Sequence, residues 1–478
     1  MDIKGKDIRE EPKGIAFLSK ILLLFQYCHL CFAPSPTINV SQCGTMISID
    51  ASCEKCKKTY NWNSQPFLLG KFPAGNLLLS FAMLCAGASV KKVLLTFKHM
   101  NLLVYHEATY YYHQRHLLIP TIVTFWRSYQ SKIEESLRGK EVVLAGDGRH
   151  DSMGHCAKFC TYTIFCCTIG LIVHIDLVQV NLCPIHTVAK TCFKANEAGS
   201  STAMELLGVK RAFAHLLATD MVIKSFISDR HGSITKWMKT ELPIQCRSLG
   251  KSVINHFFDL WHVAKKIKKI FLKLGKETGC ELIGRWSKAC ISHFYWSIRS
   301  TQELLGKVKV AKFHSFLSHV LNKHDNLPNR LFNACGHGPI QTPKVWFTKG
   351  SEAYEKLSDA LTNSRLSAAI EKVSSEAETS SLEGYHAVIN HYAPKMLAFS
   401  HQGMFARTIL AALHFNYNVQ RCSKIDDKGE SKLTVTYPKY KYGEGRVKET
   451  KTPPNFGKQF GSFLAVPLVR FTTVSRYF

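Results

Sequence analysis

Two aspartates in this sequence each follow an apolar run that is typical of a buried strand. Asp147 ends the run Glu141-Val-Val-Leu-Ala-Gly-Asp147, and Asp229 follows the run Val222–Ser228. Residues just past strand ends in a parallel or mixed sheet lie at the edge where functional sites are built. Two carboxylates on adjacent strands attract a hard, oxygen-preferring cation such as Mg²⁺. The pattern predicts a divalent-ion site of the kind that cleaves phosphodiesters when two ions bind about 4 Å apart.

A third carboxylate for such a site is offered by a helical segment near the end of the chain. Glu383, His386 and Asn390 are spaced i, i+3 and i+7, so they share one helix face. Taken singly, each acid also has a structural explanation, because an aspartate after a strand often caps a turn. The sequence contains competitors for both roles: Asp151 for Asp147, and Glu376 and Glu378 for Glu383.

Another strand-to-helix junction contains Asp259-Leu-Trp-His262. Asp259 is expected to cap a helix that begins near Trp261. The helix Val263–Leu274 has an apolar face and a basic face, which predicts contact with a phosphate backbone. An ordinary solvated face is the alternative and stays open. The basic face consists of Lys265, Lys266, Lys268, Lys269 and Lys273.

Paired cysteines near the start of the chain have the spacing of a zinc site. Cys28 and Cys31 form one C-x₂-C pair, and Cys53 and Cys56 form another after residues 32–52. Thiolates at this spacing suit tetrahedral Zn²⁺, and the segment between them is expected to form a hairpin as in a zinc ribbon. Four unligated core thiols are the alternative. A weaker group is Cys335-Gly-His337 with His324, for which core packing is the favoured interpretation.

The charge of the whole chain is strongly positive. Among 478 residues, 62 Lys and Arg oppose 35 Asp and Glu, giving a formal net charge of +27. Such a surplus favours a polyanionic partner, most often nucleic acid. Seventeen cysteines in so long a chain do not indicate a secreted disulfide scaffold. No convincing signal peptide or membrane helix is predicted, so an intracellular protein with reduced cysteines is expected.

The periodicity of the sequence predicts an α/β fold built on a mixed sheet. Strands are expected at 141–147, 159–167, 171–180 and 222–228, with a helix at 202–217 between the last two. A helix Val90–His99 capped by Ser89 lies in a helical region that fits either a helix-turn-helix unit or a plain connector. The predicted order is a zinc-ribbon-like module (22–66), the helical region (67–139), the first part of the core (140–262), a helical insertion (263–375), a helix completing the core (376–422) and a basic irregular tail (423–478).

Several short motifs in the sequence resemble those of DDE-type DNA transposases, most of all the Kolobok-type relatives. They are Gly-Asp147-Gly-Arg-His-Asp-Ser-Met-Gly-His, Ser-Asp229-Arg-His, Phe-Asp259-Leu-Trp-His262 and Leu-Glu383-Gly-Tyr-His. The resemblance implies an RNase-H-like core whose first acid lies on the first strand and whose second follows the fourth. It also implies two Mg²⁺ or Mn²⁺ ions held by Asp147, Asp229 and Glu383.

The resemblance further implies a nuclear protein that acts on double-stranded DNA, namely transposon ends and target DNA, as a homodimer. Arg149, Arg230 and His231 are expected to contact phosphate, while Asp151, His262 and His386 support the site. Segments Leu182–Ala195 and Cys246–Val253, and the tail after Gly443, depart from the family pattern. A non-catalytic DNA-binding protein derived from a transposase is therefore the alternative, and an RNA nuclease on the same fold also stays open.

Overall fold

The computed structural model describes residues 8, 11–152, 157–180, 198–338, 340, 344–377, 379–419, 421–427, 429–436 and 445–454. The segment Leu182–Ala195 and most of the tail after Gly443 lie outside these residues. The chain divides into two compact units, one made of residues 1–129 and 387–478 and the other of residues 130–386. No helix among the described residues is long and apolar enough to cross a membrane.

The first unit combines a three-stranded antiparallel sheet with short helices. Gly44, with φ +65°, makes the turn of the β1–β2 hairpin that the sequence predicted. Two further strands, β11 and β12, pair within the region predicted as an irregular tail. The strands are β1 (Thr37–Cys43), β2 (Met46–Ser52), β3 (Thr59–Asn63), β4 (Phe67–Leu68), β5 (Phe72–Pro73), β11 (Leu433–Thr436) and β12 (Arg446–Glu449).

Three helices of this unit pack together through apolar side chains of one buried cluster. Val90 and Leu94 of α3 are buried with Met83 of α2 and Tyr110 of α4. The predicted capping residue Ser89 precedes α3, but its side chain makes no capping hydrogen bond. The helices are α1 (Leu18–Leu22), η1 (Leu23–Phe25), α2 (Ala74–Cys85), α3 (Val90–His99), α4 (Glu107–His113), η2 (Gln114–Leu118) and α15 (His401–Val419), while α5 (Ile119–Ser136) and α14 (Ser380–Tyr392) run from one unit into the other.

The second unit is built on a five-stranded mixed sheet in the order β10-β9-β6-β7-β8. Strand β7 is antiparallel to β6 and β8, whereas β9 is parallel to both β6 and β10. Every residue of β7 is buried, as its place between β6 and β8 and its β-branched and aromatic sequence lead one to expect. The strands are β6 (Glu141–His150), β7 (Phe159–Cys166), β8 (Leu171–Gln179), β9 (Val222–Ser228) and β10 (Asn255–Phe258). The mixed α/β sheet predicted from the sequence is therefore present.

Helix α6 (Ser201–Leu217) packs closely on this sheet because two glycines have no side chain at the contact. A Cβ on Gly208 would lie 2.6 Å from Cβ of Tyr162, and a Cβ on Gly148 would lie 2.7 Å from Cγ of Glu205. Helices α7 (Gly232–Thr240) and α8 (Leu242–Ser248) follow β9, and Trp237 of α7 packs edge-on against Phe213 of α6. Cys246, in the segment that departs from the family pattern, is fully buried in α8.

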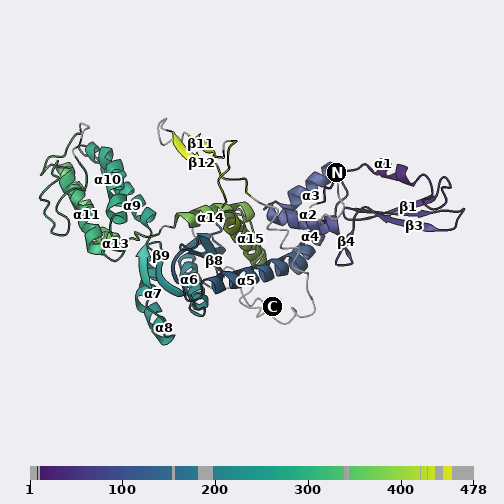
Figure 1. Ribbon diagram of the computed structural model, residues 1–478, viewed down its shortest axis with the longest axis horizontal. Helices are drawn as coiled ribbons and strands as arrows, with labels where there is room; N and C mark the ends of the chain where they lie inside the picture. The colour runs from purple at the N-terminus through teal and green to yellow at the C-terminus, as the bar shows by residue number, and fades with distance from the viewer. Residues whose placement is uncertain are drawn as a thin grey trace. The chain divides into compact units, whose positions relative to one another are not determined.

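The helices after β10 form a separate group with their own core (Figure 1). They are α9 (Leu260–Leu274), α10 (Glu281–Arg299), α11 (Gly306–His319), α12 (Glu352–Thr362) and α13 (Ser364–Glu371). The chain then returns to the sheet edge, where Val373 pairs in parallel with Phe258 of β10. We call residues 260–372 the helical insertion, because the chain leaves the sheet at β10 and comes back beside the same strand.

Candidate functional site

The two predicted aspartates lie side by side at one end of the sheet. The parallel ladder between β6 and β9 ends at the pair Gly146 and Ser228, and Asp147 and Asp229 are the next residue on each strand. Neighbouring strands are about 4.8 Å apart, so these two carboxylates belong to one site. The sequence predicted that both acids would end their strands, but β6 continues past Asp147 to His150 because it pairs with β7.

The environment of Asp147 disfavours its charge. Burial, together with repulsion from Asp229 and from Glu205, raises the pKa of Asp147 to about 8. Like charges held close together out of water disfavour simultaneous ionisation, so this cluster has an electrostatic need for a cation. The side chain of Asp147 retains 23% of its exposure and that of Asp229 retains 40%, so both are accessible.

Glu205 is a further carboxylate at this site that the sequence interpretation missed. Its carboxylate oxygens lie 3.0 Å from Nε2 of His150 and 3.7 Å from Nε2 of His231. Glu205 is the only acid in α6, and it shares a helix face with the buried small residues Gly208 and Ala212. An acid on a buried small-residue face was the signal that could have revealed it.

A hydrogen-bonded group beside Asp229 connects the sheet to the helical insertion. Nδ1 of His262 lies 2.8 Å from Asp229 and 3.1 Å from Asp259. Asp259 caps α9 as predicted, because its carboxylate accepts the backbone N–H of His262. Its other oxygen accepts the N–H of Thr379 at 2.9 Å, just before α14. Asp259 therefore fixes His262 against Asp229 and holds the start of α14.

The charge state of His262 follows from these contacts. Burial opposes a charge on the imidazole, but hydrogen bonds to Asp229 and Asp259 outweigh it and raise the pKa of His262 to about 10. The carboxyl of Asp259 is fully buried, yet its hydrogen bonds to His262 and Thr379 hold its pKa below the ordinary value. His262 is therefore an imidazolium at neutral pH and partly neutralises Asp229.

The third predicted acid lies one helical turn from this group. Nδ1 of His386 on α14 is 3.6 Å from Oδ2 of Asp147. Glu383 is three residues earlier on the same helix, where i and i+3 side chains are neighbours. Its side chain is exposed, and within the described residues its carboxylate makes no hydrogen bond or ion pair. The structure thus brings Asp147, Asp229, His262 and His386 together and leaves Glu383 at the margin.

The remaining predicted residues have identifiable local roles. Asp151 accepts the N–H groups of Lys158 and Phe159, which makes it a turn residue of the β6–β7 hairpin. Arg149 is only 4% exposed, so little of its guanidinium faces solvent. The guanidinium carbon of Arg230 lies 5.9 Å from the centre of the Phe258 ring. His231 caps α7. Of the two competitors for Glu383, Glu376 pairs with Lys224 at 3.4 Å and Glu378 lies outside the described residues.

The basic face of α9 lies open to solvent. The predicted lysines on this helix are all exposed. Lys265 stacks over the ring of Trp261 at 4.4 Å, a contact that orders part of the face. Partial burial and the positive charges of Arg230 and Arg365 lower the pKa of Lys266. Because Arg230 directly follows Asp229, a concentration of positive charge adjoins the carboxylates.

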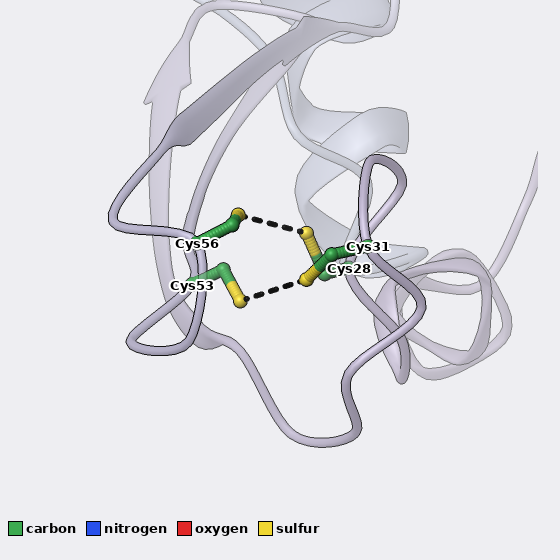
Figure 2. Close-up of side chains that lie close together, drawn as sticks. All are labelled: Cys28, Cys31, Cys53 and Cys56. Atoms are coloured by element: carbon green, nitrogen blue, oxygen red, sulfur yellow. Dashed lines mark hydrogen bonds between the residues drawn. The ribbon is translucent and has the colours of Figure 1, made fainter.

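The four predicted cysteines converge in the first unit (Figure 2). Cys28 and Cys31 come from one loop and face Cys53 and Cys56, which precede β3. The sulfurs of Cys28 and Cys56 are 3.7 Å apart, and those of Cys31 and Cys53 are 3.6 Å apart. Backbone N–H groups of Cys31 and Leu30 lower the pKa of Cys28 to about 6, which favours the thiolate that metals bind. All four sulfurs lie within 4.8 Å of one another, so this cluster could bind structural zinc.

No protein-family model matches this chain, and no curated protein is similar to it in sequence. Its function must therefore be inferred from the side chains and their arrangement. Two groups bear on that inference: the carboxylates at the end of the five-stranded sheet, and the basic residues beside them.

Proposed function

We propose that the carboxylate cluster at the end of the sheet is the catalytic centre of a DDE-type transposase, which cleaves DNA and joins strands. The single observation that carries this proposal is the adjacency of Asp147 and Asp229 on parallel strands, with the pKa of Asp147 raised to about 8. Perturbed carboxylates grouped in an accessible site are typical of functional centres. The surrounding basic residues supply the attraction for a polyanionic substrate.

The strand order supports an RNase-H-like assignment for this unit. When strands β6 to β10 are numbered 1 to 5 in chain order, the order across the sheet is 5-4-1-2-3, and only strand 2 runs opposite to the other four. Asp147 lies on the first of these strands and Asp229 directly follows the fourth. Both positions agree with the placement that the resemblance to DDE transposases implies.

The donor set fits divalent metal ions. Asp229 and Glu205 repel a negative charge on Asp147, and a repulsion of this kind is relieved by a cation. Carboxylates offer the oxygen ligands that Mg²⁺ and Mn²⁺ prefer. Asp147 and Asp229 would hold the ions, with Glu383 completing the set. Two bound ions would supply Lewis-acid activation of the attacking oxygen and stabilisation of the leaving oxygen.

The residues around the carboxylates would position the substrate and the ligands. Asp259 orients His262, and His262 in turn fixes Asp229 through the 2.8 Å contact. Arg230 and Arg365 repel the charge of Lys266, and a DNA phosphate bound beside these residues would relieve that repulsion. The exposed lysines of α9 would extend this contact along the backbone of the duplex.

The proposal is tested by replacing Asp229 and measuring metal-dependent nicking of DNA. Removal of a metal ligand forfeits several kcal/mol of transition-state stabilisation, so Asp229→Asn is expected to lower the rate at least about 1000-fold. The matched control is Asp220→Asn, since Asp220 is exposed before β9 whereas Asp229 follows it. DNA binding, followed by fluorescence anisotropy, should persist in both variants. Equal nicking by Asp229→Asn and wild type would refute the site.

The same assay decides which glutamate completes the site. Glu383→Gln is expected to abolish nicking, whereas Glu376→Gln should retain it, because Glu376 pairs with Lys224 at the strand edge. Glu205→Gln tests the other carboxylate whose charge, after that of Asp229, raises the pKa of Asp147. If Glu205→Gln abolishes nicking and Glu383→Gln does not, Glu205 is the third ligand and the resemblance misassigned it.

A protein that binds DNA without cleaving it is the second candidate function. It is favoured by the histidines that already contact both aspartates, His262 at 2.8 Å from Asp229 and His386 at 3.6 Å from Asp147. Binding without any nicking by the wild-type chain in Mg²⁺ or Mn²⁺ would select this candidate. The dimeric state and the nuclear location are expectations of the transposase proposal, and sedimentation and cell imaging test them.

A further inference from the structure

The connection between α11 and α12 is long and has little regular structure. It runs over residues 320–351 and, within the part that the structure describes, contains a single isolated bridge, between Asn329 and Phe332. Loops longer than about 15 residues without secondary structure are uncommon in compact domains and usually have a function or a constraint. We call residues 320–345 the α11–α12 loop.

Four metal-ligating side chains meet where this loop returns to α11. They are His319, the last residue of α11, together with His324, Cys335 and His337 from the loop. Their ligand atoms all lie within 4.8 Å of one another. Nδ1 of His319 is 3.2 Å from Nε2 of His337 and 3.9 Å from Sγ of Cys335. These separations are close to those between the ligands of a tetrahedral zinc ion, whose bonds are about 2.0–2.3 Å long.

Hydrogen bonds determine which ring nitrogen is left for a metal in two of the histidines. Nδ1 of His337 donates to the carbonyl of Gly338 at 2.7 Å, which leaves the lone pair on Nε2, the atom that faces His319. Nε2 of His324 lies 3.1 Å from Oδ1 of Asn322, which leaves Nδ1. That Nδ1 is buried and makes no hydrogen bond within the described residues. Metal-binding histidines usually have their second nitrogen fixed in this way.

Aromatic side chains of the helical insertion flank the cluster on the side of His319 and His324, while His337 is exposed. Trp346 lies 6.0 Å from both His319 and His324, and Trp286 lies 5.9 Å from His319, measured between ring centres. The indole N–H of Trp286 donates to the carbonyl of Val345, which fixes the end of the loop against α10. An apolar wall of this kind limits the access of water to a metal from that side.

We propose that His319, His324, Cys335 and His337 form a second structural zinc site, distinct from the four-cysteine cluster, which fastens the α11–α12 loop to the end of α11. Three imidazoles and one thiolate match the nitrogen and sulfur preference of zinc and exclude Mg²⁺ and Ca²⁺ as natural occupants. Four protein ligands close the coordination sphere, so the ion holds structure and leaves no position for substrate. The inference is independent of the proposed catalytic function.

Packing alone does not explain this arrangement. Packing does not account for the buried Nδ1 of His324, which makes no hydrogen bond within the described residues and lies near a thiol and two further imidazoles. Burial of an unpaired ring nitrogen costs free energy, which a metal bond recovers. The four residues between His319 and His324 fall within the spacing that is usual for a pair of histidine ligands of zinc. One residue separates Cys335 from His337.

The test is the zinc content of the purified full-length chain, measured by inductively coupled plasma mass spectrometry. We expect about two zinc ions per chain in the wild type, one for each cluster. Both His324→Asn and Cys53→Ser should lower the content to about one, and the combined variant should contain almost none. The matched control is His314→Gln, because His314 lies on α11 but bonds to Ser367 outside the cluster. One zinc in the wild type that survives His324→Asn would overturn the proposal.

A second measurement keeps the test decisive if His324→Asn folds poorly. Co²⁺ replaces Zn²⁺ in tetrahedral sites, and the intensity of its thiolate charge-transfer absorption follows the number of bound sulfurs. His337→Cys should keep the ion and gain intensity, because it exchanges one nitrogen ligand for a second thiolate. A folded His337→Cys variant whose cobalt spectrum equals that of the wild type would overturn the assignment.

Discussion

The four-cysteine cluster and the carboxylate cluster both gather metal-ligating side chains, but they rest on different supports. The sheet β1–β3 buries little, since its apolar cluster consists of Phe25, Ile49 and Ala51 with a few half-buried neighbours. The carboxylates lie at the end of a five-stranded sheet in which the interior strand β7 is completely buried. The thiols lie mainly beside one another, whereas the carboxylates already have the imidazoles of His262 and His386 beside them.

This difference separates two uses of a metal. Where the core is small, the metal supplies the folding free energy, as in small zinc modules. Where the core is large, the fold is complete without the metal, and the metal adds chemistry. The first region is therefore expected to lose its structure when metal is removed, and the second is expected to lose only its reactivity.

The largest expected effect is the loss of the β1–β3 sheet when zinc is removed. Chelation, or the substitution Cys53→Ser, should abolish amide exchange protection in β1–β3 and leave β6–β9 unchanged, because only the first region needs a metal to close. Hydrogen exchange followed by mass spectrometry measures both regions in one experiment. The control is Cys43→Ser, an exposed cysteine outside the cluster. Intact amide protection in β1–β3 after complete metal removal would contradict the prediction that this sheet depends on zinc.

A buried ion pair in the helical insertion gives the next largest effect. Lys309 is fully buried and donates to the carbonyl of Val373 at 2.7 Å, with Glu303 at 3.4 Å. Lys309→Met leaves Glu303 buried without its cation, so the free energy of unfolding should fall by about 3–5 kcal/mol. Urea denaturation measures this change. Lys307→Met, on the exposed face of the same helix, should change little, and an equal loss in both variants would contradict the explanation.

Replacement of His262 should have a smaller effect and should act on reactivity. His262 orients Asp229 without being a predicted metal ligand, so His262→Asn is expected to slow DNA nicking about 10–100-fold, as for other residues that position metal ligands. Steady-state nicking rates at several Mn²⁺ concentrations measure it. If His262→Asn nicks DNA at the wild-type rate at every Mn²⁺ concentration, the contact to Asp229 has no positioning role.

The charge on His262 also predicts a pH dependence of stability. Its pKa of about 10 in the folded state lies above the ordinary value of 6.5. A raised pKa means that its contribution is fully present below about pH 6.5 and is lost as the pH rises through about 10. Metal-free wild type and His262→Asn should therefore differ in unfolding free energy at pH 6 and converge above about pH 10. A difference that grows with pH would have the wrong sign.

The smallest expected effect concerns the helix that carries Glu205. The side chain of Ser200 accepts the N–H of Ala203 and caps α6. Ser200→Ala should lower the free energy of unfolding by about 0.5–2 kcal/mol. Ser89→Ala is the comparison, because Ser89 precedes α3 without a capping hydrogen bond and should change stability less. Thermal denaturation of the two variants distinguishes a serine that makes a capping hydrogen bond from a serine that only precedes a helix.

The sequence predicted the features that depend on neighbouring residues. Strands β6 to β9 and helix α6 agree with the predicted ranges within a few residues, because period and turn residues are local signals. The cysteine pairs were found by spacing, and Asp259 was recognised as a cap. The features that the sequence did not reveal depend on contacts between residues far apart in the chain. Glu205 reaches Asp147 only because Gly148 and Gly208 let α6 approach the sheet, and the role of His319 appears only when the α11–α12 loop folds back.

The return of the chain beside β10 has a consequence for how such a protein can change over evolutionary time. Phe258 and Val373 are bridge partners, and the backbone N–H of Thr379 reaches Asp259, so both ends of the helical insertion lie at one point on the sheet. The closing entropy of a connection grows only slowly with its length. Segments of different lengths could therefore be gained, exchanged or trimmed between these anchors while the sheet stays intact.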